Sequence, residues 1–195
     1  MKLSILVLVS SMIASVGCVS GSVSAPACDT QSVSIPLPPL PSGNIPPGLT
    51  FDIPALDSPP FSEDFSSTLN KVSDAVSSVQ VVVSSLTLDN KTGYLSWAKS
   101  ITVYVQGSDT VKTPKAVLAT YTASPDVGQT LSVDVTMDSD TLLTYLESGV
   151  VLFTIELGAT QINSQTVEFL QGAHGSLSTS VNLCIVATGS ESKSL

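Results

Sequence analysis

Residues 176–187, SLSTSVNLCIVA, show the pattern that decides the fold. The apolar residues Leu177, Val181, Leu183 and Ile185 stand at odd positions, and most even positions hold serine, asparagine or cysteine. An alternation with a period of two predicts a strand that turns one face to a core and the other to solvent. We therefore expect a half-buried strand over this stretch.

Other runs with the same character precede it, at the short intervals that are typical of an all-β domain. The predicted strands cover residues 79–88, 95–105, 116–121, 130–136, 150–157 and 165–170. The apolar parity of the first run changes at Ser84 and Ser85, which predicts a β-bulge. A turn is predicted at residues 90–93. The pattern predicts a mainly β protein, an antiparallel immunoglobulin-like β-sandwich with a proline-rich N-terminal arm and one or two short helices. Trp97 is the candidate core aromatic residue.

Two segments have helical spacing instead. Phe61, Phe65, Leu69, Val72 and Val76 follow at intervals of three and four, so one helix is predicted from Ser62 onward. The second helix is predicted over residues 141–147, with Asp138 or Ser139 as its N-cap and Gly149 at its end.

The N-terminal third is rich in proline, because most of the 12 prolines lie between Pro26 and Pro60. Proline excludes a helix or a central strand there, so an extended arm is predicted. We expect it to pack along the domain, since it also carries many apolar residues; a stiff spacer is the alternative. The predicted organisation is a tether and arm over 18–60, with 19–27 as the tether, a sandwich domain over 61–188, and a disordered tail over 189–195.

Residues 1–17 have the features of a secretory signal peptide. Lys2 gives a positive start, an apolar run follows, and small residues precede Cys18. The run is shorter than the roughly 20 residues of a membrane-spanning helix. We therefore expect an exported protein.

The segment Val16-Gly17-Cys18 resembles the last three positions of the lipobox of bacterial lipoproteins, although Ser15 stands where that class has an aliphatic residue. The resemblance implies an envelope protein with a lipid such as palmitate on Cys18. Val19 stands where inner-membrane retention would place aspartate, so the outer membrane is favoured. A second possibility is cleavage by a standard signal peptidase near Ala25.

The 3 cysteines support export under either cleavage. With Cys18 lipidated or removed, Cys28 and Cys184 form an even pair, and an oxidising compartment permits a disulfide between them. Two buried free thiols are the alternative.

The charge pattern excludes one class of partner. The formal net charge is −9, and every basic residue is a lysine. Binding to a phosphate backbone needs clustered lysine or arginine, so nucleic acid is excluded as a partner. The low share of charged residues, 12%, predicts a surface of serine, threonine, asparagine and glutamine.

No arrangement of residues predicts catalysis, a cofactor or a metal. The sequence has 1 histidine, His174, which lies in a glycine-rich loop. No nucleophile elbow accompanies it, so His174 is predicted to be a solvent-exposed turn residue. Asp134, Asp138 and Asp140 do not match a calcium loop. The remaining acids, among them Glu63, are predicted to be solvated surface residues rather than a glycosidase pair.

The predicted function is therefore non-catalytic: a lipid-anchored envelope protein that supports structure or binds another envelope protein. The alternative is a carrier of an apolar ligand, whose cavity between arm and sandwich would be lined by Phe51, Phe61, Phe65 and Phe153. A hydrolase built on His174 is the least favoured class.

Overall fold

The computed structural model describes residues 19–43, 45–89, 95, 97–122 and 130–193, with twelve strands and three helices among them. Cys18, the predicted signal peptide and the turn predicted at 90–93 lie outside the described residues. The strands are β1 (Val19–Pro36), β2 (Thr50–Ile53), β3 (Leu56–Asp57), β4 (Phe61–Asp64), β5 (Val79–Asp89), β6 (Ser100–Gln106), β7 (Ala116–Thr122), β8 (Thr130–Ser132), β9 (Asp134–Val135), β10 (Val150–Leu157), β11 (Thr160–Asn163) and β12 (Ser176–Lys193). The helices are α1 (Ser66–Ser73), α2 (Ser139–Glu147) and α3 (Ser164–Gln171).

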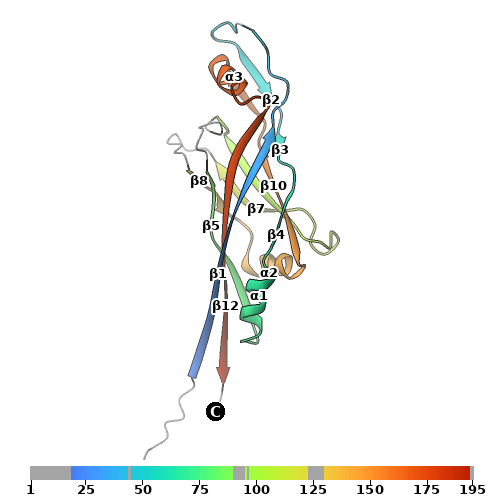
Figure 1. Cartoon of the computed structure of the whole chain (residues 1–195), viewed down its shortest axis with the longest axis vertical. Coiled ribbons are helices and arrows are strands. Elements are labelled where there is room, and N and C mark those ends of the chain that lie inside the picture. The colour runs from blue at the N-terminus through green and yellow to red at the C-terminus, as the bar shows by residue number, and fades with distance from the viewer. Residues whose placement is uncertain (1–18, 44, 90–94, 96, 123–129, 194–195) are drawn as a thin grey trace, which may run out of the picture.

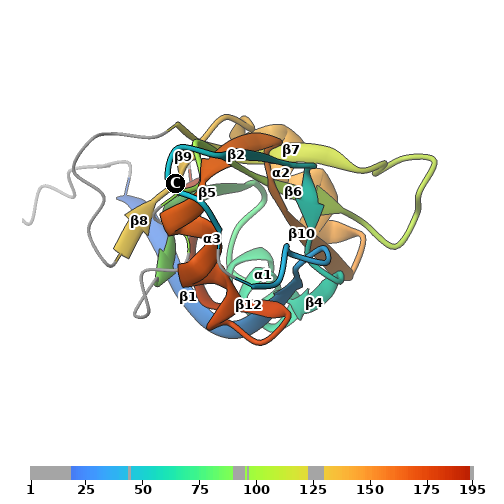
Figure 2. The same ribbon diagram turned by 90° about the horizontal axis from the view of Figure 1, so that it is seen from above.

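The strands form antiparallel sheets in a sandwich-like arrangement, which confirms the predicted mainly β fold. A four-stranded sheet has the order β1-β12-β5-β8, and a six-stranded sheet has the order β3-β10-β6-β7-β9 with β4 also paired to β10. A separate two-stranded sheet pairs β11 with β2. Seen along the long axis, β1 and β12 lie on one side of the molecule and β6 and β7 on the other (Figure 2). The core between them includes the fully buried side chains of Ile101, Leu118, Phe153 and Ile185.

Strands β1 and β12 form a long two-stranded ribbon that runs along the molecule (Figure 1). Each strand has 18 residues, and pairing extends from Val19 opposite Lys193 to Pro36 opposite Ser176. Leu177, Val181, Leu183 and Ile185 are buried, as the alternation in β12 predicts. The start of β1 and the end of β12 therefore lie together at one pole, and α3 and β2 lie at the other (Figure 1).

This ribbon corrects the predicted domain boundaries. Residues 19–27, predicted as a tether, are the first half of β1, and residues 189–193 of the predicted disordered tail are the end of β12. Residues 19–36 of the predicted tether and arm are thus an edge strand of the sandwich, and the rest of the arm includes β2 and β3. Serine and alanine hid it in the sequence, because this part of the ribbon buries few large side chains.

Two prolines stand within β1, and the pairing explains why they fit. The Cα atoms of Cys28 and Cys184 lie 4.0 Å apart, a spacing that belongs to a pair without mutual backbone hydrogen bonds. Even-numbered residues of β1 therefore direct their backbone groups away from β12, and the Thr30 N–H accordingly bonds the Asp29 carboxylate at 2.7 Å. Pro26 and Pro36 are also even-numbered residues of β1. Their backbone nitrogens therefore face away from β12, and neither proline removes a hydrogen bond between the two strands.

The predicted bulge is confirmed. Cys184 pairs with Ser85 and Ile185 with Val83, which leaves Ser84 as the extra residue of β5. The extra residue restores the inward direction of Val81 and Leu86, both of which are buried.

The helices were predicted less accurately than the strands. Helix α2 lies where predicted, but the first helix is shorter, because residues 61–64 pair with β10 as β4. The strand predicted at 165–170 is wrong, and this run belongs to α3, which Asn163 caps by accepting the Thr166 N–H at 2.9 Å. Three helices thus replace the predicted one or two. No helix among the described residues is both long and apolar enough to cross a membrane.

Trp97 is not in a strand, and the strand predicted from residue 95 begins at Ser100. A turn closed by the Ala98 N–H on the Leu95 carbonyl precedes it, with a separation of 3.0 Å. Trp97 is half-buried at this turn, and Phe153 and its neighbours supply the centre of the core instead.

Candidate functional site

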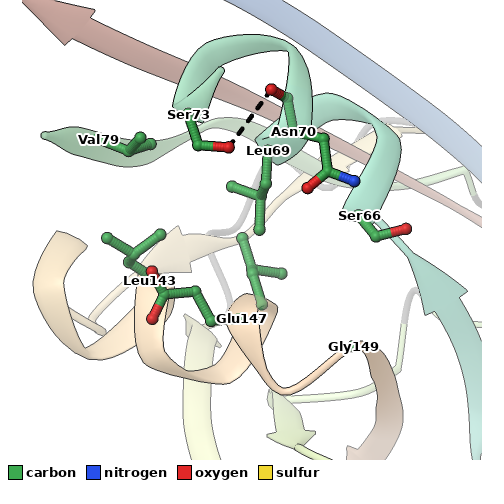
Figure 3. A pocket seen from close by; sticks show the side chains of 9 residues that line it. Ser66, Leu69, Asn70, Ser73, Val79, Leu143, Glu147 and Gly149 are labelled. Atoms are coloured by element: carbon green, nitrogen blue, oxygen red, sulfur yellow. Dashed lines mark hydrogen bonds between the residues drawn. The ribbon is translucent and has the colours of Figure 1, made fainter. Parts of the chain in front are cut away.

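Helices α1 and α2 border a hollow of about 190 Å³ that is partly open to solvent. Leu69 points from α1 toward α2, and the side chains of Leu143 and Glu147 lie on the facing helix (Figure 3). The lining residues are Ser66, Leu69, Asn70, Ser73, Val79, Leu143, Leu146, Glu147 and Gly149. The floor is therefore apolar, and the polar side chains stand around it.

Local hydrogen bonds position both walls of this hollow. The Asp138 carboxylate accepts the Thr141 N–H at 2.9 Å and the Thr141 hydroxyl at 2.8 Å, which caps α2. These bonds also lower the pKa of Asp138, and the bond from the Thr141 backbone N–H has the larger effect. On the α1 side, the Asp64 carboxylate accepts the Ser66 N–H at 2.8 Å and so starts the helix without a side-chain cap from Phe65.

The rim of the hollow is acidic. Glu147 is exposed in the last turn of α2, a turn that has no basic residue. Asp64 pairs with Val150 at the end of β4, beside Gly149 and Ser66 of the lining. Within the part of the chain that the structure describes, Glu147 forms no ion pair. The hollow thus combines an apolar floor with unpaired negative charge.

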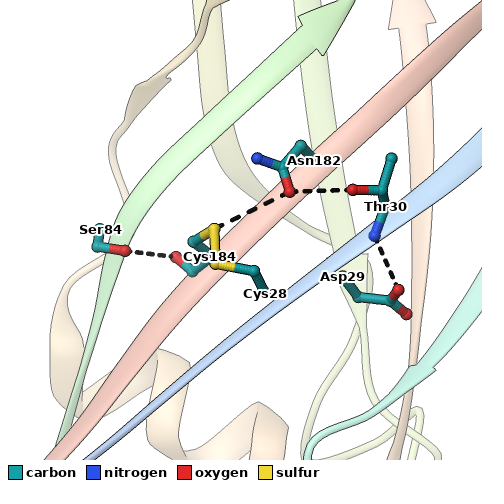
Figure 4. The surroundings of a disulfide bond; sticks show 6 residues. All are labelled: Cys28, Asp29, Thr30, Ser84, Asn182 and Cys184. Carbon is teal, nitrogen blue, oxygen red and sulfur yellow. Dashed lines mark hydrogen bonds between the residues drawn. A yellow bond between two sulfur atoms is a disulfide. The ribbon is translucent and has the colours of Figure 1, made fainter.

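The predicted disulfide between Cys28 and Cys184 is present, and it joins directly opposed residues of β1 and β12 (Figure 4). Cys28 is exposed, because the even-numbered side chains of β1 face solvent. Beside the bond, the Ser84 hydroxyl donates to the Cys184 carbonyl at 3.2 Å. The Thr30 hydroxyl and the Asn182 side-chain oxygen lie 3.2 Å apart across the ribbon. The ribbon is therefore held covalently at its middle.

A carboxyl pair next to the disulfide connects the ribbon to the opposite sheet. Glu63 of β4 is only 8% exposed, and its side chain is hydrogen-bonded to Asp29 of β1. Burial, together with the adjacent Asp29, raises the pKa of Glu63 to about 7. The same hydrogen bond and the Thr30 N–H lower the pKa of Asp29. Glu63 was predicted as a solvated surface acid, and this prediction is wrong: its carboxyl group is buried beside Asp29, and both effects favour its protonated form.

His174 lies where the sequence places it, in the turn between α3 and β12. Its backbone φ of 50° is left-handed, and its side chain is exposed. Its N–H donates to the Gln171 carbonyl at 3.3 Å, so it belongs to the hydrogen-bonded end of the helix. No serine–histidine–carboxylate arrangement is formed around it by the described residues.

The other residues singled out in the sequence have structural positions. Asp138 caps α2, and the described residues hold no group of three or more candidate metal ligands. Phe61 and Phe153 stack with ring centroids 5.7 Å apart, and Phe65 is buried in the same core. Phe51 is half-buried in β2. These phenylalanines pack against protein.

Comparison with known proteins finds no matching family model, no matching curated protein and no matching solved structure. The candidate site therefore depends on geometry alone. Sequence reasoning did not find the hollow, because its serines and leucines are common residues from three separated segments. The Asp29–Glu63 pair also gave no signal, because β1 was not recognised as a strand.

Proposed function

We propose that the chain is a non-catalytic protein of the cell envelope, anchored by a lipid on Cys18, which acts as a structural or protein-binding module. The place where β1 begins supports this proposal. β1 begins at Val19, directly after Cys18, and every residue of β1 pairs with β12. A lipid at this point would attach to the end of the ribbon rather than to a loose linker.

The ribbon supports a role as a stem. It is closed at Cys28–Cys184 and it continues into the core sheet beside β5. The two poles of the long molecule differ: one holds the start of β1, next to the proposed anchor position, and the other holds α3 and β2 (Figure 1), with β11 paired to β2. Such a stem would hold the sandwich at a defined distance from the lipid surface, where another envelope protein meets it.

Charge narrows the class of partner. A net charge of −9 without arginine disfavours nucleic acid and anionic surfaces and favours a basic protein surface. Val19 next to Cys18 favours the outer membrane over the inner membrane. Both assignments belong to the proposal.

The alternative, a carrier of an apolar ligand, has less support. The four phenylalanines expected to line its cavity include a stacked pair and a buried core residue. The hollow between α1 and α2 is about 190 Å³, below the roughly 300 Å³ at which pockets for small-molecule ligands begin. Larger hollows, of about 350 Å³ beside Leu37 and Leu40 and about 540 Å³ beside Ile53, are open surface grooves and not enclosed cavities.

Replacement of the anchor tests the proposed function. Cys18→Ser should move the protein from the detergent phase to the aqueous phase or leave it unprocessed, and should abolish incorporation of labelled palmitate. Ser22→Ala, a nearby exposed position, should change neither. If Cys18→Ser partitions like the native chain, the lipid anchor is wrong. In a separate experiment, crosslinking of intact envelopes would identify the protein partner of the native chain.

A further inference from the structure

The hollow between α1 and α2 has the size of a single side chain. Its volume of about 190 Å³ is several times the roughly 30 Å³ of one water molecule. Leu69, Val79, Leu143 and Leu146 form an apolar floor from three elements, and Leu143 and Val79 remain partly exposed. An aliphatic chain that enters would remove this surface from water, which is favourable.

The negative charge at the rim favours a cationic end group on the aliphatic chain that enters the hollow. Glu147 lies in the last turn of α2, where the helix dipole disfavours an anion and favours a cation. A cation bound here would neutralise Glu147 and complement the helix end together.

The charged groups on the elements next to the hollow also have a net negative charge, like Glu147. Asp64 lies beside Gly149 and Ser66, and α1 ends with Lys71 and Asp74. With Glu147, these groups comprise three acids and one base. Asn70, Ser66 and Ser73 add neutral hydrogen-bonding groups to the lining. An acidic ligand would meet repulsion here, whereas a basic one would not.

We propose that this hollow receives a lysine or arginine side chain of a partner protein, with its aliphatic stem on the leucine floor and its cationic end against Glu147. This proposal deepens the proposed function, since it names the chemistry of the protein partner. Long basic side chains bury their methylene stems while the charge remains hydrated. The net charge of −9 would also steer a basic partner to this protein.

Three alkyl probes of equal length test the proposal: hexylammonium, hexanol and hexanoate, each titrated into the purified full chain. Leucine and valine methyl resonances in NMR spectra report binding. We expect hexylammonium to shift the methyl groups of Leu69, Val79 and Leu143, and to bind about fivefold more tightly than hexanol, as an exposed ion pair allows. Hexanoate should bind most weakly.

Glu147→Gln should reduce the ratio between hexylammonium and hexanol to about one. Glu168→Gln, an exposed acid on α3, should leave the ratio unchanged. Equal binding of the three probes to the native chain, or shifts outside the hollow, would overturn the proposal. Loss of the anchor in the Cys18→Ser experiment would leave these titrations unaffected, so the two proposals fail separately.

Discussion

The two halves of β1 are stabilised in different ways. In residues 29–36 the inward side chains include Val33 and Ile35, which are 5% and 0% exposed. In residues 22–27 the inward side chains are Val23, Ala25 and Ala27, which are only partly buried at the margin of the core. The disulfide at Cys28 lies where the two halves meet. Strand β1 is thus kept in place by burial in residues 29–36, and by pairing and the disulfide in residues 22–27.

The difference shows how a strand persists where a core is thin. Backbone pairing alone gives little net stability, and an isolated two-stranded ribbon is marginal in water. Pairing between β12 and β5 ends at Gly189 opposite Val79. Beyond that point, in residues 19–22 of β1 and 190–193 of β12, the ribbon has no third strand.

Removal of the disulfide should have the largest effect. The bond closes a loop with a sequence separation of 156, for which the chain-entropy model predicts about 5 kcal/mol of stabilisation. The double change Cys28→Ala with Cys184→Ala should lower the free energy of unfolding by about that amount, measured by urea denaturation. Hydrogen exchange should accelerate first in residues 22–27.

The matched control for this change is Ser32→Ala with Ser180→Ala, a directly opposed pair on the same face of the ribbon. It should alter stability by less than about 0.5 kcal/mol, as for surface positions. If the cysteine variant loses protection equally in both halves of β1, the division at Cys28 is wrong.

Truncation of one inward side chain in each half should separate the two mechanisms. Ile35→Ala should cost about 3 kcal/mol, because it opens a cavity in a filled core. Val23→Ala should cost about 1 kcal/mol or less, because its side chain is only partly buried. Urea midpoints at constant m-value would measure both. Equal costs would mean that burial supports the whole strand.

Stability should also depend on pH through the pair that joins β1 to β4. The pKa of Glu63 is raised from 4.5 to about 7, so between these pH values the folded state retains a proton that the unfolded state has released. Stability should therefore fall as the pH rises through this window, by about 1–2 kcal/mol after allowance for partial hydration. The pKa of Asp29 is lowered in the folded state, so the ionised Asp29 stabilises the fold at neutral pH. This stabilisation is lost only as the pH falls into the acid range.

Glu63→Gln should remove this decline, since the amide donates to Asp29 without releasing a proton. Thermal unfolding at pH 5 and pH 8 would show a smaller difference for the variant than for the native chain. Glu168→Gln provides the control at an exposed acid. A decline that persists in Glu63→Gln would assign it to another group.

The smallest effect is expected at Pro26, in the half that depends on pairing. Its outward parity means that Pro26→Ala breaks no hydrogen bond and adds one unpaired N–H at the sheet edge. The change should cost about 0.5 kcal/mol, mainly through the freer unfolded chain, and should increase self-association in sedimentation experiments. Ser24→Ala, with the same parity, should do neither. A cost above about 2 kcal/mol would place Pro26 in a packed contact.

Sequence patterns predicted the neighbours of β1 that are built on burial, but neither half of β1 itself. The alternation in β12, the bulge at Ser84 and the cap at Asp138 all leave a local record, because each depends on residues close together in the chain. Residues 22–27 leave none: serine, alanine and proline suit a tether as well as an edge strand. Helix α3 was missed because Val167 and Phe169 alternate like strand residues, whereas the buried positions are Val167 and Leu170.

The candidate sites depend on contacts that no local pattern records. Cysteine parity predicted the disulfide, since only two partners remained. Glu63 and Asp29 meet because β4 and β1 lie on facing sheets, and the hollow forms where α1 meets α2. Ordinary residues become a site there through their placement, which the sequence alone does not reveal.

The disulfide also determines how the molecule would bear a mechanical load. A pull on Val19 along the long axis, against a load on the sandwich, is applied parallel to β1 and so shears the ribbon. At Cys28 the tension passes through sulfur into β12, the strand flanked on both sides within the sheet. Only residues 19–27 can then peel away, and the rest of the molecule carries the load with its core sheet intact.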